Sequence, residues 1–219
     1  MPPTLLWFAL LAVVVWLPLP LGSNRPWSGA LLIALSFGLV SLWAIRYAIA
    51  PYRLPPALRL ARPALLWGWA WVSYGLLQTL PLPSIWVAGL NPSAYQLYQT
   101  AYSALNLPMP TWLPLSVNVA ATAWATAQAT AYLILFFLVL VLAHDTQRFK
   151  TLALTFLTVA ACNATYGLLV AFEGADSALR ITPYLGHSMV SGTYVNRNHF
   201  AGLMILILPL GMALLRIQA

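Results

Sequence analysis

The feature that most limits how this chain can fold is a series of long apolar runs that carry almost no charge. The runs are continuous, whereas the strands of a membrane barrel alternate apolar with polar residues, so they predict helices. Only 6% of the residues are charged and 62% are hydrophobic. A soluble domain has about 25% charged and about 45–50% apolar residues. The sequence therefore predicts an all-α fold, a polytopic bundle of transmembrane helices.

We expect about six transmembrane helices, because each span needs about 20 predominantly apolar residues. They should form a single transmembrane domain over residues 1–219. The first run is interpreted as a retained helix and not as a cleaved signal peptide, since no Lys or Arg precedes Arg25. The predicted spans cover residues 4–22, 29–45, 63–81, 119–143, 151–172 and 199–216.

The arginines of one short loop predict the orientation of the chain. Arg46, Arg53, Arg59 and Arg62 lie close together there with no acidic residue among them. Short loops rich in Lys and Arg stay in the cytoplasm, so this loop should be cytoplasmic, and both termini with it. The same arginines have a second interpretation, as a site for anionic lipid headgroups. In this topology Arg148, Lys150 and Arg216 are also cytoplasmic, whereas Arg25, Arg180 and Arg197 are external.

The net charge of +7 is thus explained by membrane topology, and we expect no nucleic-acid partner. Residues 82–118 carry no charge and are too irregular to span a bilayer. Within them, Pro92 follows Asn91 and predicts a short helix that reaches Leu105. Its tyrosines at positions 95, 98 and 102 share one face, which is typical of a helix lying in the outer interface. This helix forms either a wall of a lipid-access groove or a re-entrant packing element.

The densest group of polar side chains lies in residues 173–198, an outer loop before the last predicted span. Asn196 or Asn198 is well placed to cap the helix that should begin near His199. The N-terminus of a helix attracts anions, because its N–H groups and its dipole both favour negative charge. Arg197 lies in the same short stretch, so this helix start is a candidate anion site.

Two further residues of the outer loop complete the candidate site. Gly192 can adopt backbone conformations that other residues resist, and it predicts a sharp turn before the helix. Arg180 supplies a second guanidinium, and two converging arginines can bind a phosphate or pyrophosphate through paired hydrogen bonds. The alternative is an ordinary loop, in which Asn and Gly only shape the helix start and the arginines lie among lipid headgroups.

Other kinds of site find little support. The sequence contains no phosphate-binding loop, zinc-ligand spacing or nucleophile elbow. His187, His199, Glu173 and Asp176 share one loop, but their spacing matches no known ligand set, so we predict no metal. Cys162 lies inside an apolar run, where packing is a commoner role than nucleophilic attack.

The outer loop resembles the signature of the O-antigen ligase and O-antigen polymerase membrane family. That signature is an Arg, then Gly-Thr-aromatic, then Asn-x-Asn, then an aromatic residue or Leu, then Ala. Two other segments, residues 22–27 and residues 114–118 with the helix that follows them, resemble the same family. The matching residues of the outer loop are Arg180, Gly192, Thr193, Tyr194, Asn196, Asn198, Phe200 and Ala201.

The resemblance implies a function at the periplasmic face of the bacterial inner membrane. Members of this family are metal-independent, cofactor-free glycosyltransferases that take a glycan from undecaprenyl pyrophosphate. By this likeness Arg180 would hold the pyrophosphate, while Arg197 occupies a position where the family varies. No catalytic residue is assigned; if this chain were active by itself, the base would be His199 or His187. The residues expected to bind the donor are Arg180, Arg197, Asn196, Asn198 and Gly192.

The chain departs from the family in length. Typical members have about ten to twelve helices and a large later periplasmic loop that supplies further Arg and His residues. We therefore expect the N-terminal half of a lipid-linked glycan ligase or polymerase, inactive alone. Its partners would be membrane lipid, the lipid-linked glycan, and a separate C-terminal half or a larger membrane complex. The alternative is a truncated, non-catalytic paralogue that serves as a structural or accessory subunit.

Overall fold

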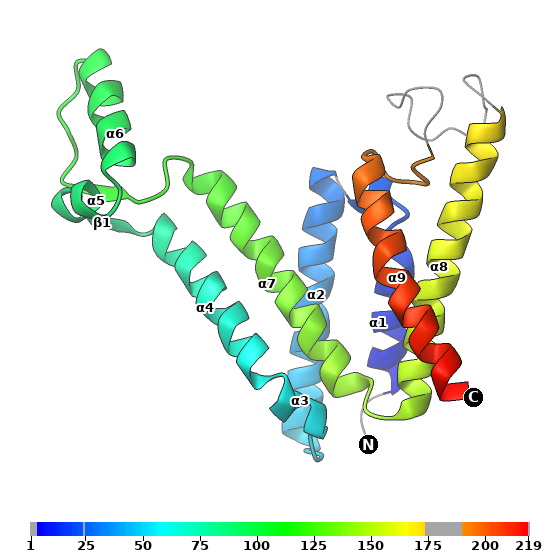
Figure 1. Cartoon of the computed structure of the whole chain (residues 1–219). Coiled ribbons are helices and arrows are strands. Elements are labelled where there is room, and N and C mark those ends of the chain that lie inside the picture. Colours follow the sequence, from blue (N-terminus) through cyan, green and yellow to red (C-terminus); the bar gives the residue numbers. More distant parts are fainter. Residues whose placement is uncertain (1–3, 24, 174–189, 219) are drawn as a thin grey trace. The chain divides into compact units, whose positions relative to one another are not determined.

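The computed structural model describes residues 4–23, 25–173 and 190–218, and these are mostly helical (Figure 1). The short strands β1 and β2 form one antiparallel pair. The elements in chain order are α1 (Thr4–Trp16), a 3-10 turn (Leu21–Ser23), α2 (Pro26–Ile49), α3 (Pro56–Leu60), α4 (Arg62–Thr79), β1 (Pro81–Pro83), α5 (Ser84–Leu90), α6 (Pro92–Ala104), β2 (Trp112–Pro114), α7 (Val119–Leu142), α8 (Thr146–Glu173) and α9 (Arg197–Gln218).

The chain is an all-α membrane protein, because four of its described helices are long and apolar enough to cross a bilayer: α2, α7, α8 and α9. The expected count of about six spans is not confirmed. Helix α1 has 13 residues and is therefore about 20 Å long, shorter than a hydrocarbon core of about 30 Å. Helix α4 has 18 residues, but Trp, Tyr and Gly take the place of many aliphatic side chains in it.

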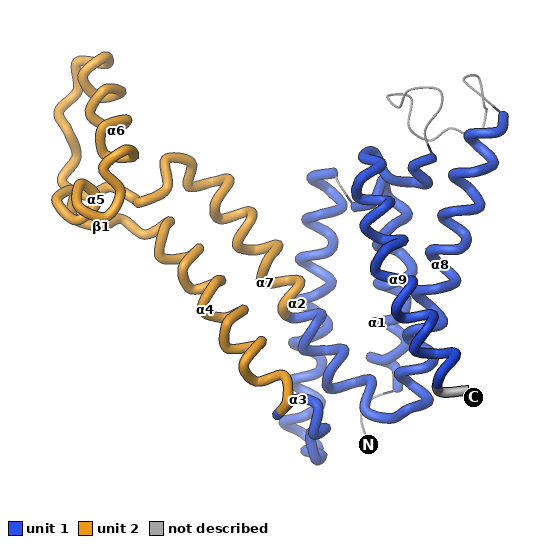
Figure 2. Tube along the Cα trace, in the orientation of Figure 1, with its two compact units in different colours: residues 1–59, 134–219 blue, residues 60–133 orange. Residues whose placement is uncertain are grey.

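The described residues divide into two compact units (Figure 2). Unit 1 consists of Met1–Arg59 and Ile134–Ala219, and unit 2 of Leu60–Leu133. In unit 1, the start of α1 and the end of α9 lie at the same end (Figure 1). The core of unit 1 is formed by aliphatic side chains of α1, α2 and the second half of α7. Its most deeply buried members are Leu10, Leu32, Leu138, Val141 and Leu142.

The first helix ends earlier than the sequence predicts. The expected span of residues 4–22 is helical only as far as Trp16. Pro18 and Pro20 have no N–H to donate, so the helical ladder stops and a tight turn follows. In that turn Gly22 has φ +65°, and the Ser23 hydroxyl donates a hydrogen bond to the carbonyl of Leu17.

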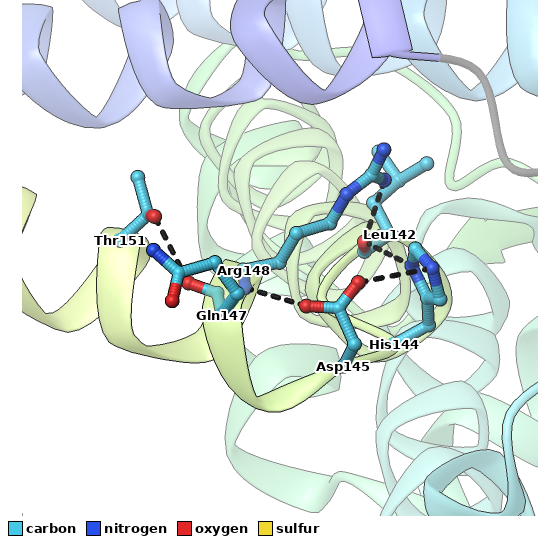
Figure 3. A network of polar contacts seen from close by, with 6 residues as sticks. All are labelled: Leu142, His144, Asp145, Gln147, Arg148 and Thr151. Atoms are coloured by element: carbon cyan, nitrogen blue, oxygen red, sulfur yellow. Dashed lines mark hydrogen bonds and ion pairs between the residues drawn. The ribbon is translucent and has the colours of Figure 1, made fainter.

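The connection between α7 and α8 is closed by a compact polar network (Figure 3). The Asp145 carboxylate accepts a hydrogen bond from the N–H of Arg148 at 2.7 Å, and it lies 3.2 Å from the His144 ring. The Arg148 guanidinium donates to the carbonyl of Leu142 at 3.0 Å and lies over the Trp7 ring. Asp145 thus caps α8, which begins at Thr146 and not at residue 151 as predicted.

In unit 2, α4 packs closely on the first half of α7. A Cβ added at Gly68 would lie 2.6 Å from Leu133, and one at Gly75 would lie 2.4 Å from the Thr126 hydroxyl. Small residues at such points let two helix backbones approach, as is common in membranes. The same unit contains the predicted short helix, present as α6, whose first turn is capped by Asn91.

Helix α6 is held by its hydrogen bonds to the segment that leads into α7. The Tyr98 hydroxyl donates to the carbonyl of Ser116 at 2.8 Å, and the Asn91 amide donates to the carbonyl of Leu115 at 3.3 Å. The sequence analysis missed α5 and the β1–β2 pair in the same region. Each of these elements is short, and both strands contain prolines, which argue against a strand in a sequence.

Candidate functional site

The centre of the candidate site is the turn Ser191–Gly192–Thr193, which is buried at the end of unit 1 where α8 ends and α9 begins. Gly192 has φ +55°, a conformation that favours glycine. The prediction of a sharp turn at Gly192 is therefore confirmed. The turn packs against two other parts of unit 1, α8 and the α1–α2 connection.

Asn163 of α8 binds this turn directly. Its side-chain oxygen accepts a hydrogen bond from the N–H of Thr193 at 2.9 Å, and its amide nitrogen donates to the Thr193 hydroxyl at 3.0 Å. The Thr193 hydroxyl in turn donates to the carbonyl of Pro18. Asn163 is 4% exposed and Thr193 is 7% exposed, so water does not compete with these bonds. One polar chain therefore links α8, the turn before α9 and the end of α1.

Glycines surround this polar chain because the backbones approach closely. A Cβ on Gly192 would lie 1.9 Å from the side-chain oxygen of Asn163. A Cβ on Gly167, one helical turn after Asn163, would lie 2.8 Å from the backbone nitrogen of Gly192. On the other side, a Cβ on Gly22 would meet the ring of Tyr194 at 2.4 Å. The Gly192–Thr193–Tyr194 stretch thus lies between α8 and the α1–α2 turn.

The start of α9 follows immediately. The Asn196 side chain accepts a hydrogen bond from the N–H of Asn198 at 2.8 Å, so Asn196 caps the helix. The helix begins at Arg197, two residues before the predicted His199. Arg197, Asn198 and His199 are exposed in its first turn. The structure therefore places a cation and two polar side chains at the positive end of the α9 dipole.

Tyr194 anchors this helix start to the rest of unit 1. Its ring lies 6.3 Å from that of Phe200, which is buried in the second turn of α9, and it contacts Gly22 on its other side. Burial raises the pKa of the Tyr194 phenol above its ordinary value of 10.0. The phenol is therefore neutral at physiological pH, and its ring packs against Phe200 and Gly22.

An apolar pocket of about 720 Å³ adjoins the turn. It runs along α8 from Thr151 to Tyr166, a length of about 22 Å at the helical rise. Val15 and Leu19 form part of its wall, and Asn163 and Thr193 lie in its lining. The pocket thus has a mainly hydrocarbon wall, and one of its polar lining residues, Thr193, lies three residues before the α9 cap Asn196.

The predicted site residues are only partly brought together. Gly192, Asn196, Arg197, Asn198 and His199 lie in one continuous stretch, and of the two predicted caps, Asn196 and Asn198, the structure has Asn196. Arg180, His187 and Asp176 lie outside the described residues. The sequence analysis missed the link between Asn163 and Thr193. In the structure Asn163 binds the turn before α9.

Among the described residues, no group of three or more His, Cys, Asp or Glu side chains could hold a metal ion. Cys162 is exposed on α8 and lines the apolar pocket. The described parts of unit 1 offer cationic, amide and hydroxyl groups, which suit an anionic ligand.

Comparison with known proteins found no match to a protein-family model, a curated protein or a solved structure. The class of protein is defined by the fold alone, as an all-α membrane protein. The likeness to O-antigen ligases and polymerases rests on the motif residues and stays a prediction.

Proposed function

We propose that this chain binds an undecaprenyl-pyrophosphate-linked glycan where α9 begins, as part of a lipid-linked glycan ligase or polymerase. The observation that carries the proposal is the attachment of Gly192–Tyr194 to Asn163 and to the α1–α2 turn. This attachment ties the capped start of α9 to α8 and to the α1–α2 turn. A helix start that is held in place beside an arginine can receive phosphate oxygens with little reorganisation.

The apolar pocket supports the same proposal. Its wall along α8 suits part of an isoprenoid chain, and Thr193 belongs both to this lining and to the turn before α9. A lipid lying in the pocket would carry its pyrophosphate toward Arg197. Arg180 is proposed, from the family resemblance, as the second guanidinium. Departure of a pyrophosphate requires stabilisation of negative charge, which guanidinium groups supply well in a site that excludes water.

The reaction itself would need more than these residues. In the resembled family the base and further arginines come from a later periplasmic loop. His199 is exposed in the first turn of α9 and is our candidate base within this chain. We expect the 219 residues to bind the donor and not to transfer its glycan.

The first expected result concerns the two arginines. Arg180→Ala should lower the affinity for an undecaprenyl-pyrophosphate glycan by roughly 10- to 100-fold, since a charge-assisted phosphate contact is worth about 1.5–3 kcal/mol. Arg197→Ala should also weaken binding. Arg180→Lys should restore it only in part, because lysine lacks the bidentate fork. A binding titration in detergent micelles measures these affinities.

Arg25→Ala is the matched control, because it removes a cation next to the α1–α2 turn and leaves in place the hydrogen bonds between the Arg25 backbone and the Ser28 hydroxyl. Equal affinity of the wild type and the Arg180 and Arg197 variants would refute donor binding. The second candidate, an accessory subunit of a larger complex, would then be favoured. Helix α4 supports that candidate, since Trp67 and Trp71 are 77% and 70% exposed on one face.

The second expected result concerns topology. We propose about six spans in the bacterial inner membrane, with α1 and α4 added to the four apolar helices and both termini in the cytoplasm. In a Cys162→Ala background, an impermeant maleimide should label His199→Cys in intact cells and leave Arg53→Cys unlabelled until the cells are opened. The opposite pattern would reverse the orientation, and labelling of both in intact cells would refute the proposed alternation.

A further inference from the structure

A second pocket lies in unit 1 at the C-terminal end of α2. It has a volume of about 740 Å³ and is lined by residues 51–55 together with Tyr47, Leu58 and Arg59. Neither the candidate donor site nor the family resemblance involves this pocket. Its lining combines two arginines, Arg53 and Arg59, with tyrosine rings and apolar side chains. It contains no acidic residue.

Aromatic contacts hold the wall of this pocket in place. The Trp43 ring stacks on Tyr47 with 5.4 Å between centroids, and its edge contact with Phe137 of α7 has a centroid distance of 4.8 Å. Tyr52 meets Tyr47 edge-on at 5.5 Å. The Trp43 indole N–H donates a hydrogen bond to the Tyr52 hydroxyl at 2.9 Å. The segment after α2 is therefore folded back onto its helix by specific contacts.

The polar groups of the pocket are suited to an anion. The Tyr52 hydroxyl accepts from Trp43, and its own proton has no acceptor within the described ranges. Arg53 and Arg59 are exposed, and neither makes a hydrogen bond or an ion pair with any described residue. Two guanidinium groups and one hydroxyl can together contact several oxygens of a single phosphate.

The position of the pocket along α2 identifies where such a phosphate would come from. Helix α2 has 24 residues and is therefore about 36 Å long, which exceeds a hydrocarbon core of about 30 Å. Its last turn and the pocket after it thus lie at the level of the lipid headgroups. Tyr and Trp rings such as Tyr47 and Trp43 are typical of that level. Leu54 and Leu58 provide an apolar edge beside the cations.

We propose that this pocket binds the headgroup of an anionic phospholipid, with Arg53 and Arg59 on its phosphate and Tyr52 donating a hydrogen bond. The bilayer presents such headgroups at this depth on every side of the protein. The lipid stays in the membrane, and the pocket selects it by the net negative charge of its headgroup, which a zwitterionic lipid with the same phosphate lacks. This inference does not depend on the proposed glycan donor site.

The test is native mass spectrometry of the purified chain titrated with phosphatidylglycerol or phosphatidylcholine of the same acyl chains. We expect roughly tenfold tighter binding of phosphatidylglycerol. Arg53→Ala/Arg59→Ala should lower that affinity by roughly 10- to 100-fold, and Tyr52→Phe by about fivefold. Both arginines are exposed and make no bonds with described residues, so the double variant should keep its fold, which circular dichroism checks.

The matched control is Lys150→Ala/Arg216→Ala, which removes two positive charges at the same end of unit 1 and should change the affinity by less than about twofold. Equal losses in the two double variants would show a general attraction to basic residues and would overturn the pocket. Equal binding of the two lipids would overturn it as well. Displacement of the lipid by millimolar glycerol phosphate would show a site for free phosphate in its place.

Discussion

Replacing Gly192 with alanine is expected to lower the free energy of unfolding by roughly 3–5 kcal/mol, although the change adds only one methyl group. Two causes combine. The backbone of Gly192 has φ +55°, where an L side chain costs about 1–2 kcal/mol. The new Cβ would also lie 1.9 Å from the side-chain oxygen of Asn163, so the hydrogen bonds from Asn163 to Thr193 must break or lengthen. Unfolding of the purified protein in detergent micelles by added denaturant measures the loss.

Gly202→Ala is the matched control, because Gly202 lies only ten residues after Gly192. It lies within α9, and a Cβ there would meet no atom within 4 Å. Alanine is a better helix former than glycine by about 1 kcal/mol, so this variant should be as stable as the wild type or more so. A Gly192→Ala protein that unfolds at the same denaturant concentration as the wild type would contradict the described contact between the turn and α8.

Removing the side-chain amide of Asn163 should cause the second largest loss in the free energy of unfolding. In Asn163→Ala the N–H of Thr193 keeps its buried position and loses its acceptor. A buried polar group without a partner costs about 1–3 kcal/mol, and the small cavity adds to this, so we expect a loss of roughly 2–4 kcal/mol. The free energy of unfolding in micelles is again the measured quantity.

Thr158→Ala controls for a change on the same helix, since Thr158 is exposed and lines the same apolar pocket. Its loss should stay within about 0.5 kcal/mol. A double-mutant cycle of Asn163→Ala with Thr193→Val isolates the pair, and we expect a coupling of about 1–2 kcal/mol. Additive effects of the two substitutions would mean that the two side chains do not stabilise each other.

Local patterns in the sequence predicted the four long apolar helices and the capped start of α9. The apolar runs became α2, α7, α8 and α9, because a bilayer leaves a continuous apolar chain only the helix in which to pair its backbone. The cap of α9 was predicted as Asn196 or Asn198, and Asn196 makes it, since a cap joins residues two or three positions apart. The sharp turn at Gly192 belongs to the same group.

The ends of the helices were less well predicted where one or two residues determine them. Asp145 caps α8 and starts it several residues before the apolar run, so the run alone set the start too late. At the end of α1, the prolines at positions 18 and 20 interrupt the backbone ladder inside a run that is apolar throughout. Hydrophobicity predicts how much of the chain is apolar enough to enter a membrane. The ends of a helix depend instead on backbone N–H groups and on capping side chains.

The sequence by itself therefore determined the class of the protein, the order of its long helices and the polar stretch before α9. Only the tertiary structure decided that Asn163 meets Thr193, that Gly22 and Gly167 make room for that stretch, and that apolar and basic pockets flank the helices of unit 1. The physical reason is distance along the chain. Periodicity and caps depend on neighbours within about four positions. A contact between residues far apart depends on how closely two backbones pack, which no local pattern records.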